Sequence, residues 1–436
     1  MSVQIFLFIP LALIAALPVV PLGVSIGAYL VIAHLDLSGS GFASAASVGL
    51  GNLIKVVVLP TILLMRARWI GSREVIRSRT FWVWVLFVIY VAVAALWSPL
   101  PLSALKQVGY LYSYTVFFVL LVGLYRADKR LAYRVLSWST LAAVGLGFVG
   151  YMLGGMRRMG RYTVFSSMQS FGLYLALVAV LVLAFPRRYI VGGVPKWMLL
   201  PLLGIALALN GSRTGGVILL GAVLVYGTFY TLRGRFSYGF VMLTVGIVWV
   251  GCLLLGILAN LTPTQRQMIL TENRLLQPVS AILYPQYSFQ DIGTFRFRLE
   301  MYQVVVGRIQ ERGNWLWGNG TSSAGDLIAK GIIEYRGYDA RTVDANRIVH
   351  NEFLRALYEW GIVGLILFGG TLLGIIGISL KNFVTQGRLE VWVVTLAFIG
   401  GLVVSMAVEN ILAGAGTPVG TAVALGMAHM VTLGDR

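Results

Sequence analysis

The chain has 436 residues, of which 58% are hydrophobic and 11% charged, and its formal net charge is +18 at pH 7. A soluble domain carries about 25% charged and about 45–50% apolar residues, so this composition excludes an ordinary cytosolic enzyme. The positive charge is spread over short segments between apolar runs, which argues against a nucleic-acid-binding protein and indicates membrane topology instead.

Apolar runs of about 20 residues recur along the chain, each long enough to cross a hydrocarbon core of about 30 Å. We predict an all-α, polytopic integral membrane protein with about twelve transmembrane helices. The predicted spans are 5–34, 48–65, 80–97, 108–126, 133–154, 169–185, 195–210, 214–232, 238–260, 353–380, 388–408 and 412–431. Pro18 and Pro21 interrupt the first run, which therefore forms either one kinked helix or two short ones.

Basic residues cluster in the even-numbered loops between these spans. The clusters are Arg66 to Arg79, Arg126 to Arg134, Arg187 to Lys196, Arg233 with Arg235, and Lys381 with Arg388. Positive residues near span ends are retained in the cytoplasm, so both termini are predicted to be cytoplasmic. The odd-numbered loops near 35–47, 98–107 and 409–411 are nearly free of basic residues and are predicted to face outward.

Two places carry arginine on the side where topology disfavours it. Arg157, Arg158 and Arg161 follow the fifth span, and Arg213 stands in NGSRTGG between the seventh and eighth spans. Anion binding is the simplest reason to keep positive charge there. The alternatives are lipid headgroups as partners of the first group and simple snorkelling of Arg213 from a helix end.

Residues 261–349 form the only long polar stretch, which divides the chain into helices 1–9 (residues 1–260), a large outward loop, and helices 10–12 (residues 350–436). Apolar residues recur at helical spacing in RFRLEMYQVVVGRI, so this loop is predicted to be partly helical and folded over the membrane surface. Arg296 and Arg298 lie in this stretch. They are candidate site residues, and the alternative is that they belong to a solvated helix face.

His350 ends the loop where the tenth span begins, at the water–membrane boundary. An imidazole there can remove a proton from a bound hydroxyl; the alternative is a helix cap or an interfacial polar group. Glu359 and Glu409 either orient other groups or pair with arginine. Lys55, within the second span, requires a partner or a cavity, and its role stays open.

Other classes of site are not indicated. Cys252 is the single cysteine, so neither intramolecular disulfides nor a cysteine-based metal site is predicted. The sequence has no phosphate-binding Walker loop, dinucleotide fingerprint or His/Asp metal cluster, so neither a metal nor a cofactor is expected.

The segment HNEFLRALYEWGIVGL resembles the signature of the bacterial O-antigen ligase and O-antigen polymerase superfamily: a His-Asn or His-Ser pair, a Leu-rich turn, then Glu-x-Gly-x-x-Gly. The matching residues are His350, Asn351, Leu354, Glu359, Gly361 and Gly364. NGSRTGG resembles the family's Ser-Arg-Gly segment and carries one family arginine onto Arg213. RLEMY carries the second onto Arg298, with Tyr302 in place of the usual Trp. LWGNG, residues 316–320, resembles a Leu-x-Gly-x-Gly turn, whereas SSMQSFGLYL departs from the family's Asn-Pro-Asn.

The resemblance implies a GT-C-like membrane glycosyltransferase of the bacterial inner membrane, with its active site facing the periplasm. It implies transfer of a glycan from undecaprenyl diphosphate, with inversion and without a metal. Arg213 and Arg298 would hold the diphosphate, with Arg157, Arg158 and Arg161 as a weaker third contact. His350 would accept the proton of the attacking hydroxyl, and Arg296, Asn351, Glu359 and Glu409 would support the site.

The acceptor separates the family branches: lipid A–core oligosaccharide for a ligase, a second lipid-linked glycan for an O-antigen or exopolysaccharide polymerase. A single dominant outward loop favours the ligase. A transporter of lipid-linked glycans is the alternative of another class, and it predicts essential charges on both faces and repeated halves. The expected partners are the lipid-linked donor, the acceptor and membrane lipids, with no nucleic acid; the oligomeric state is left open.

Overall fold

The structure is a computed structural model, and it describes residues 20–34, 54–67, 76–152, 157–158, 161–162, 171–172, 174–176, 178–179, 196–210, 215–216, 218–221, 223, 293–336, 349–386, 389–408 and 412. Its ordered elements are helices, apart from β1 (Arg157–Arg158) and β2 (Arg161–Tyr162), which pair as an antiparallel hairpin. The all-α expectation therefore holds for the described part of the chain except at this two-residue pairing.

Three of the described helices are long and apolar enough to cross a membrane. They are α6 (Arg79–Ala94) with its 3-10 extension η2 (Ala95–Trp97), α7 (Pro101–Ala127) and α17 (Glu352–Gln386), the last over Glu352–Thr385. They coincide with the predicted spans 80–97, 108–126 and 353–380, so the protein is a membrane protein. Predicted spans such as 238–260, and the part of 5–34 before residue 20, which contains Pro18, lie outside the described residues; Pro21 directly precedes α2.

The other described helices occupy further predicted spans and the polar segment. They are α2 (Leu22–His34), the π-helical turn η1 (Ile54–Val58), α4 (Leu59–Arg66), α8 (Lys129–Met152), α10 (Lys196–Asn210), α15 (Gly293–Arg312), α16 (Ser323–Arg336) and α18 (Leu389–Val408). Lys55 falls in η1, within the second predicted span. The amphipathic stretch 296–309 lies within α15.

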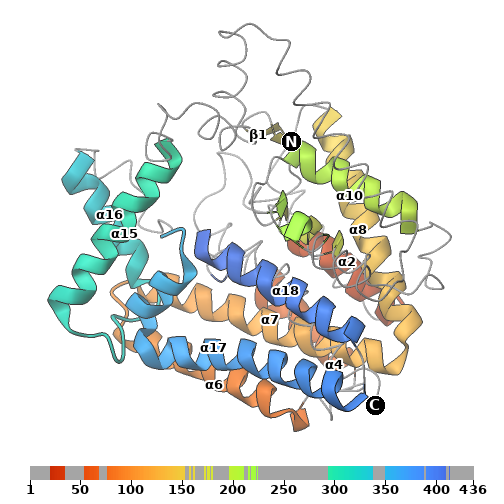
Figure 1. The fold of residues 1–436 in the computed structure, drawn as a ribbon, viewed down its shortest axis with the longest axis horizontal. Coiled ribbons are helices and arrows are strands. Elements are labelled where there is room, and N and C mark those ends of the chain that lie inside the picture. The colour runs from red at the N-terminus through yellow and green to blue at the C-terminus, as the bar shows by residue number, and fades with distance from the viewer. Residues whose placement is uncertain are drawn as a thin grey trace, which may run out of the picture.

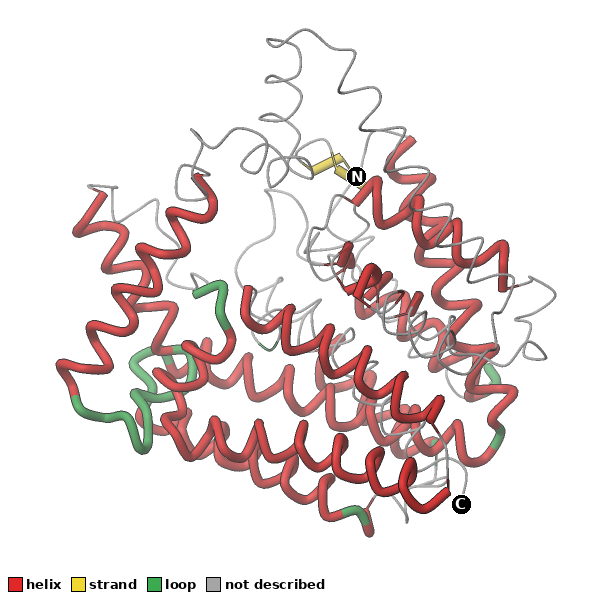
Figure 2. The backbone as a smooth tube through the Cα atoms, in the orientation of Figure 1, coloured by secondary structure: helices red, strands yellow, loops and turns green. Residues whose placement is uncertain are grey.

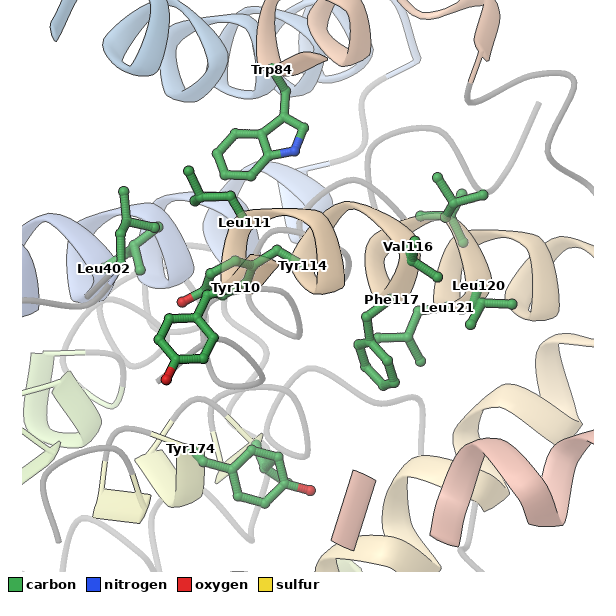
Figure 3. Packing of buried hydrophobic residues seen from close by; sticks show 14 of the residues in the cluster. Trp84, Tyr110, Leu111, Tyr114, Val116, Phe117, Leu120, Leu121, Tyr174 and Leu402 are labelled. Atoms are coloured by element: carbon green, nitrogen blue, oxygen red, sulfur yellow. The ribbon is translucent and has the colours of Figure 1, made fainter. Parts of the chain in front are cut away.

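Helices α6, α7, α17 and α18 lie side by side as a bundle, and α2 and α8 pack together beside them (Figure 1). α7 is the central helix, since 72% of its span window is buried, against 39% for α6 and 33% for α17. Its aromatic and aliphatic side chains, with Tyr110, Leu111 and Tyr114 among them, lie between Trp84 of α6 on one side and Tyr174 on the other (Figure 3).

α6 and α17 pack closely and run in opposite directions. Thr80, near the start of α6, contacts Gly374, whereas Tyr90, near the end of α6, lies beside Gly364. Small residues let two helix backbones approach within a membrane, where packing rather than water exclusion drives association. The start of α17 and the end of α6 are thereby placed at the same end of the bundle.

α15 and α16 lie beyond that end of the bundle (Figure 1), joined to each other by the loop drawn in green between them in Figure 2. A second apolar cluster connects them to α17; its buried members are Met301, Val305, Ala324, Ile328, Val349 and Tyr358. Basic residues mark the opposite end of the bundle, where α6 begins at Arg79 and α17 carries Lys381. Helices α15 and α16 therefore lie at one end of the membrane-spanning bundle, and Arg79 and Lys381 lie at the other end.

Candidate functional site

His350 stands immediately before α17 in an unusual backbone conformation. Its φ is 58°, and it is one of two non-glycine residues with positive φ in the described part of the chain. Such backbone is uncommon for side chains with a Cβ, and strained positions of this kind cluster at functional sites. Asn351 follows as the helix cap: its Oδ1 accepts from the N–H of Leu354 at 3.0 Å. The His-Asn pair thus turns the chain into the helix and leaves the His350 imidazole half-buried.

α15 contacts this turn directly. The hydroxyl of Tyr302 donates to the carbonyl oxygen of His350 at 2.8 Å, and it lies 3.5 Å from the carbonyl oxygen of Ala407 at the end of α18. Arg298 precedes Tyr302 by four residues and so shares its helix face. The structure therefore brings the helix that carries Arg298 against His350.

A break in α17 lies eleven residues after His350, at Gly361, whose φ is 63° and ψ −167°. A break in a helix leaves backbone groups without their usual partners. The turn 315–320 supplies them: the N–H of Ile362 donates to the carbonyl of Trp315 at 2.8 Å, and the N–H of Gly320 donates to the carbonyl of Glu359 at 2.9 Å. The LWGNG and Glu-x-Gly segments, which the sequence presents as separate motifs, are therefore one interlocked unit.

Glycine is required where these two segments meet. Gly318, Gly320 and Gly361 all have positive φ, and a Cβ on Gly318 would overlap with the carbonyl oxygen of Glu359. A Cβ on Gly361 would overlap in the same way with the carbonyl oxygen of Leu316. The glycines of both motifs thus serve a close backbone contact, which places them in the framework of the site.

A buried charged cluster fills the space beneath this contact. Arg355 is 3% exposed, and its guanidinium bonds Glu352, which is fully buried, lies 3.7 Å from Glu359 Oε2, and sits 4.9 Å from the ring centre of Trp360. With the amide of Gln107 oriented toward the guanidinium, its oxygen accepts from Arg355 at 2.6 and 3.1 Å. Burial of an ion pair demands partners within the protein, because each charge has lost its water.

The cluster also binds the segments around it. Glu359 Oε1 accepts from the N–H of Ala324, at the start of α16, at 3.4 Å, and Glu352 Oε2 accepts from the N–H of Leu412 at 3.2 Å. Gln107 reaches Ser322, just before α16, at 2.9 Å. The start of α17 is thereby tied to α7, to the loop helices and to the chain beyond α18.

The predicted site residues are distributed unevenly over the described structure. His350, Asn351, Arg298 and Glu359 gather at one end of the bundle, but Glu359 is buried against Arg355 instead of facing the open side. Arg157, Arg158 and Arg161 form the β hairpin, and Arg296 lies on α15. Arg213 and Glu409 lie outside the described residues. Two described residues near Glu409 in the sequence contact the start of α17 or its support: the carbonyl oxygen of Ala407 lies 3.5 Å from the Tyr302 hydroxyl, and the N–H of Leu412 donates to Glu352.

Sequence reasoning did not predict Arg355, Glu352 or Gln107 as part of the site. One signal was present: Glu352, Arg355 and Glu359 recur at helical spacing on one face, and opposite charges three and four residues apart pair on a helix. Nothing in the sequence indicates that Gln107, on another helix, completes the cluster. Among the described residues, no three His, Cys, Asp or Glu side chains gather as a metal site.

Comparison with protein families matches residues 197–369 to the model described as O-antigen ligase. The matched region contains Arg213, α15, the turn 315–320, His350 and the first part of α17. Comparison with curated proteins gives no match.

Proposed function

We propose that the protein acts as an O-antigen ligase. Its residues 197–369 belong to the superfamily of O-antigen ligases and O-antigen polymerases. With its apolar spanning helices, it is therefore a glycosyl-transfer enzyme of the membrane. The donor is a glycan carried on undecaprenyl diphosphate. The acceptor is lipid A–core oligosaccharide, and the reaction takes place at the periplasmic face of the inner membrane, with both termini in the cytoplasm.

His350 is the general base of the proposed reaction. Its imidazole takes the proton of the acceptor hydroxyl as that oxygen bonds to the anomeric carbon. The bond from this carbon to the phosphate oxygen breaks on the opposite side, and its electron pair leaves with the diphosphate, so the configuration inverts. The observation that carries this assignment is the strained turn at His350, held by α15 through Tyr302 inside the family-matched region.

Arginine residues hold the diphosphate in this proposal. Planar guanidinium groups match phosphate oxygens in pairs and stay charged at every physiological pH. Arg213 and Arg298 make the main contacts, and the hairpin with Arg157, Arg158 and Arg161 a weaker third. Arg296, Asn351, Glu359 and Glu409 support the site. Because a diphosphate is already a good leaving group, the chemistry requires no metal.

The test is glycan transfer by the purified protein, with a defined undecaprenyl-diphosphate glycan as donor and lipid A–core as acceptor. His350→Ala should lower the transfer rate by about 10²–10⁴-fold, the usual contribution of a general base, while donor binding persists. The matched control is His34→Ala, at the end of α2, which should transfer at the wild-type rate.

Four results would contradict the proposal. Undiminished transfer by His350→Ala removes the general base. Transfer only to a second lipid-linked glycan identifies a polymerase. Movement of the donor across a vesicle membrane with no glycosidic product identifies a transporter. Loss of activity with a chelator, restored by added metal, would overturn the metal-free reaction.

A further inference from the structure

We infer that six exposed apolar side chains form a surface that sits in the headgroup layer of the membrane leaflet next to the site. They are Leu96, Trp97, Leu102, Trp315, Leu316 and Trp317, and we call them the interfacial corner. Its partner is the lipid leaflet itself. The inference is independent of the glycan-transfer proposal.

The corner is one surface although its two segments are far apart in the sequence. The hydroxyl of Ser98 donates to the carbonyl of Thr321 at 2.6 Å, and the hydroxyl of Tyr90 donates to the carbonyl of Trp317 at 2.8 Å. These bonds join α6 and its connection to α7 to the turn between α15 and α16. The tryptophans of both segments therefore lie at one level of the molecule.

The surface below the corner is apolar and exposed. On α6 the exposed residues Leu86, Ile89 and Val93 recur at helical spacing, and on α17 Ile366 and Leu373 are 65% and 69% exposed. Between Thr80 and Trp97, and between Gly361 and Leu380, the sequence contains no charged residue. An apolar helix face of this length is covered by lipid tails in a membrane protein.

The surface above the corner is charged. α15 carries the ion pair Arg308–Glu311 at 2.8 Å, with side chains 45% and 62% exposed, and α16 carries Lys330–Asp326 at 2.6 Å. Charged side chains exposed in this way are solvated by water. The change from apolar to charged surface takes place across the turn 315–317, and tryptophan, with its apolar ring and polar N–H, is enriched at this boundary.

The dimensions of α17 agree with this placement. From Gly361 to Lys381 the helix rises about 30 Å at about 1.5 Å per residue, which equals the thickness of a hydrocarbon core of about 30 Å. Lys381 then lies at the far boundary, near the start of α6, where Trp82 is 49% exposed and donates its Nε1–H to the carbonyl of Ile76. Both boundaries thus carry tryptophan.

The backbone of the corner suits the same depth. Irregular backbone is tolerated at the edge of the membrane only when its polar groups have partners in the protein. The carbonyls of Trp315 and Leu316 accept from the N–H groups of Ile362 and Val363 at 2.8 and 3.3 Å, and that of Trp317 accepts from Tyr90. The exposed side chains can therefore contact lipid without exposing unpaired carbonyls.

A spin label measures the depth of the corner directly. In a Cys252→Ala background, Trp97→Cys and Trp317→Cys are labelled and reconstituted in vesicles of phosphatidylethanolamine and phosphatidylglycerol. Ile89→Cys marks the membrane interior and Glu311→Cys marks water. We expect the ratio of accessibility to oxygen over accessibility to a nickel chelate to fall between the two references at both corner positions.

Three results with the spin label overturn the inference: a Trp317 label as accessible to the chelate as Glu311, one as deep as Ile89, or one shielded from both reagents, which would mean that a second copy covers the corner. An unlabelled double variant, Trp315→Phe with Trp317→Phe, guards against a label that disturbs the fold. Its fluorescence should lose part of the quenching by lipids brominated near the headgroups. Unchanged quenching would also overturn the inference.

Discussion

The two halves of α17, divided at Gly361, are built on opposite principles. The first half buries Glu352, Arg355 and Glu359 among hydrogen-bond partners from α7, α16 and the chain beyond α18. The second half has no charge until Lys381 and exposes much of its apolar side, including Ile366. One continuous helical pattern therefore serves two environments.

The comparison shows that the break, more than the composition, separates the site from the membrane. By length and hydropathy, Glu352–Thr385 forms one candidate span. The change of direction at Gly361 and its interlock with the turn 315–320 assign the charged half to the loop helices and the apolar half to the bundle. Charges in the first half are stable because protein groups replace water around them.

The largest expected effect comes from Gly361→Ala, which alters the residue at the break between the two halves of α17. The φ of 63° and ψ of −167° lie in a region that essentially only glycine adopts, which costs a residue with a Cβ about 1–3 kcal/mol, and the overlap with the backbone of Leu316 cannot relax. We expect a total at or above about 5 kcal/mol, the exceptional range for one substitution, seen as loss of monodisperse protein and of the thermal transition in detergent.

The matched control for that variant is Gly369→Ala, in the second half, where nothing lies within 4 Å of an added Cβ. It should unfold at the wild-type temperature or slightly above, because alanine is favoured over glycine in a helix by about 1 kcal/mol. Equal stability of the two variants would contradict the interlock.

The sequence predicts the apolar spans, including the second half of α17, better than the interlock at Gly361. A run of about 20 apolar residues is sufficient evidence for a span, so 80–97, 108–126 and 353–380 were predicted and are helices of the structure. The interlock could not be predicted, because the contact between Leu316 and Gly361 depends on how distant segments meet. The LWGNG and Glu-x-Gly motifs can be recognised in the sequence by their glycines, but the sequence does not indicate that the two segments contact each other.

Arg355→Met is expected to have the next largest effect. The thioether fills part of the volume, but Glu352 and Glu359 then stay buried without their cation, which costs about 3–5 kcal/mol. The thermal midpoint in detergent should fall well below that of Arg308→Met. That control removes an exposed arginine from the Arg308–Glu311 pair, which contributes about 0–1 kcal/mol.

A double variant separates pairing from packing. Adding Glu352→Gln to Arg355→Met should recover part of the lost stability, since it removes one of the two stranded charges. If the double variant is as unstable as the sum of the single ones, the buried charges are not coupled as the structure indicates.

The candidate site itself was predicted in part. The His-Asn pair predicts the start of a helix, because asparagine is a favourable N-terminal cap and the apolar run follows directly. The charged residues after it were harder to interpret, since Arg and Glu near a helix end are normally solvated. Only the packing of α7 and α16 against that end makes Arg355 a buried residue.

The smallest expected effect on stability is that of Tyr302→Phe, which removes one hydroxyl from the first half's contact with α15. Loss of its bond to the carbonyl of His350 should cost about 0.5–1.5 kcal/mol. Tyr112→Phe, which removes a hydroxyl 2.8 Å from Thr61 Oγ1 inside the bundle, should cost about the same.

Under the proposed function, only Tyr302→Phe also slows glycan transfer, by about 10-fold, because the His350 turn loses its support and small misplacements of a reacting group are costly. Equal transfer rates in the two variants, at matched loss of thermal stability, would show that the contact with α15 holds the fold without orienting His350.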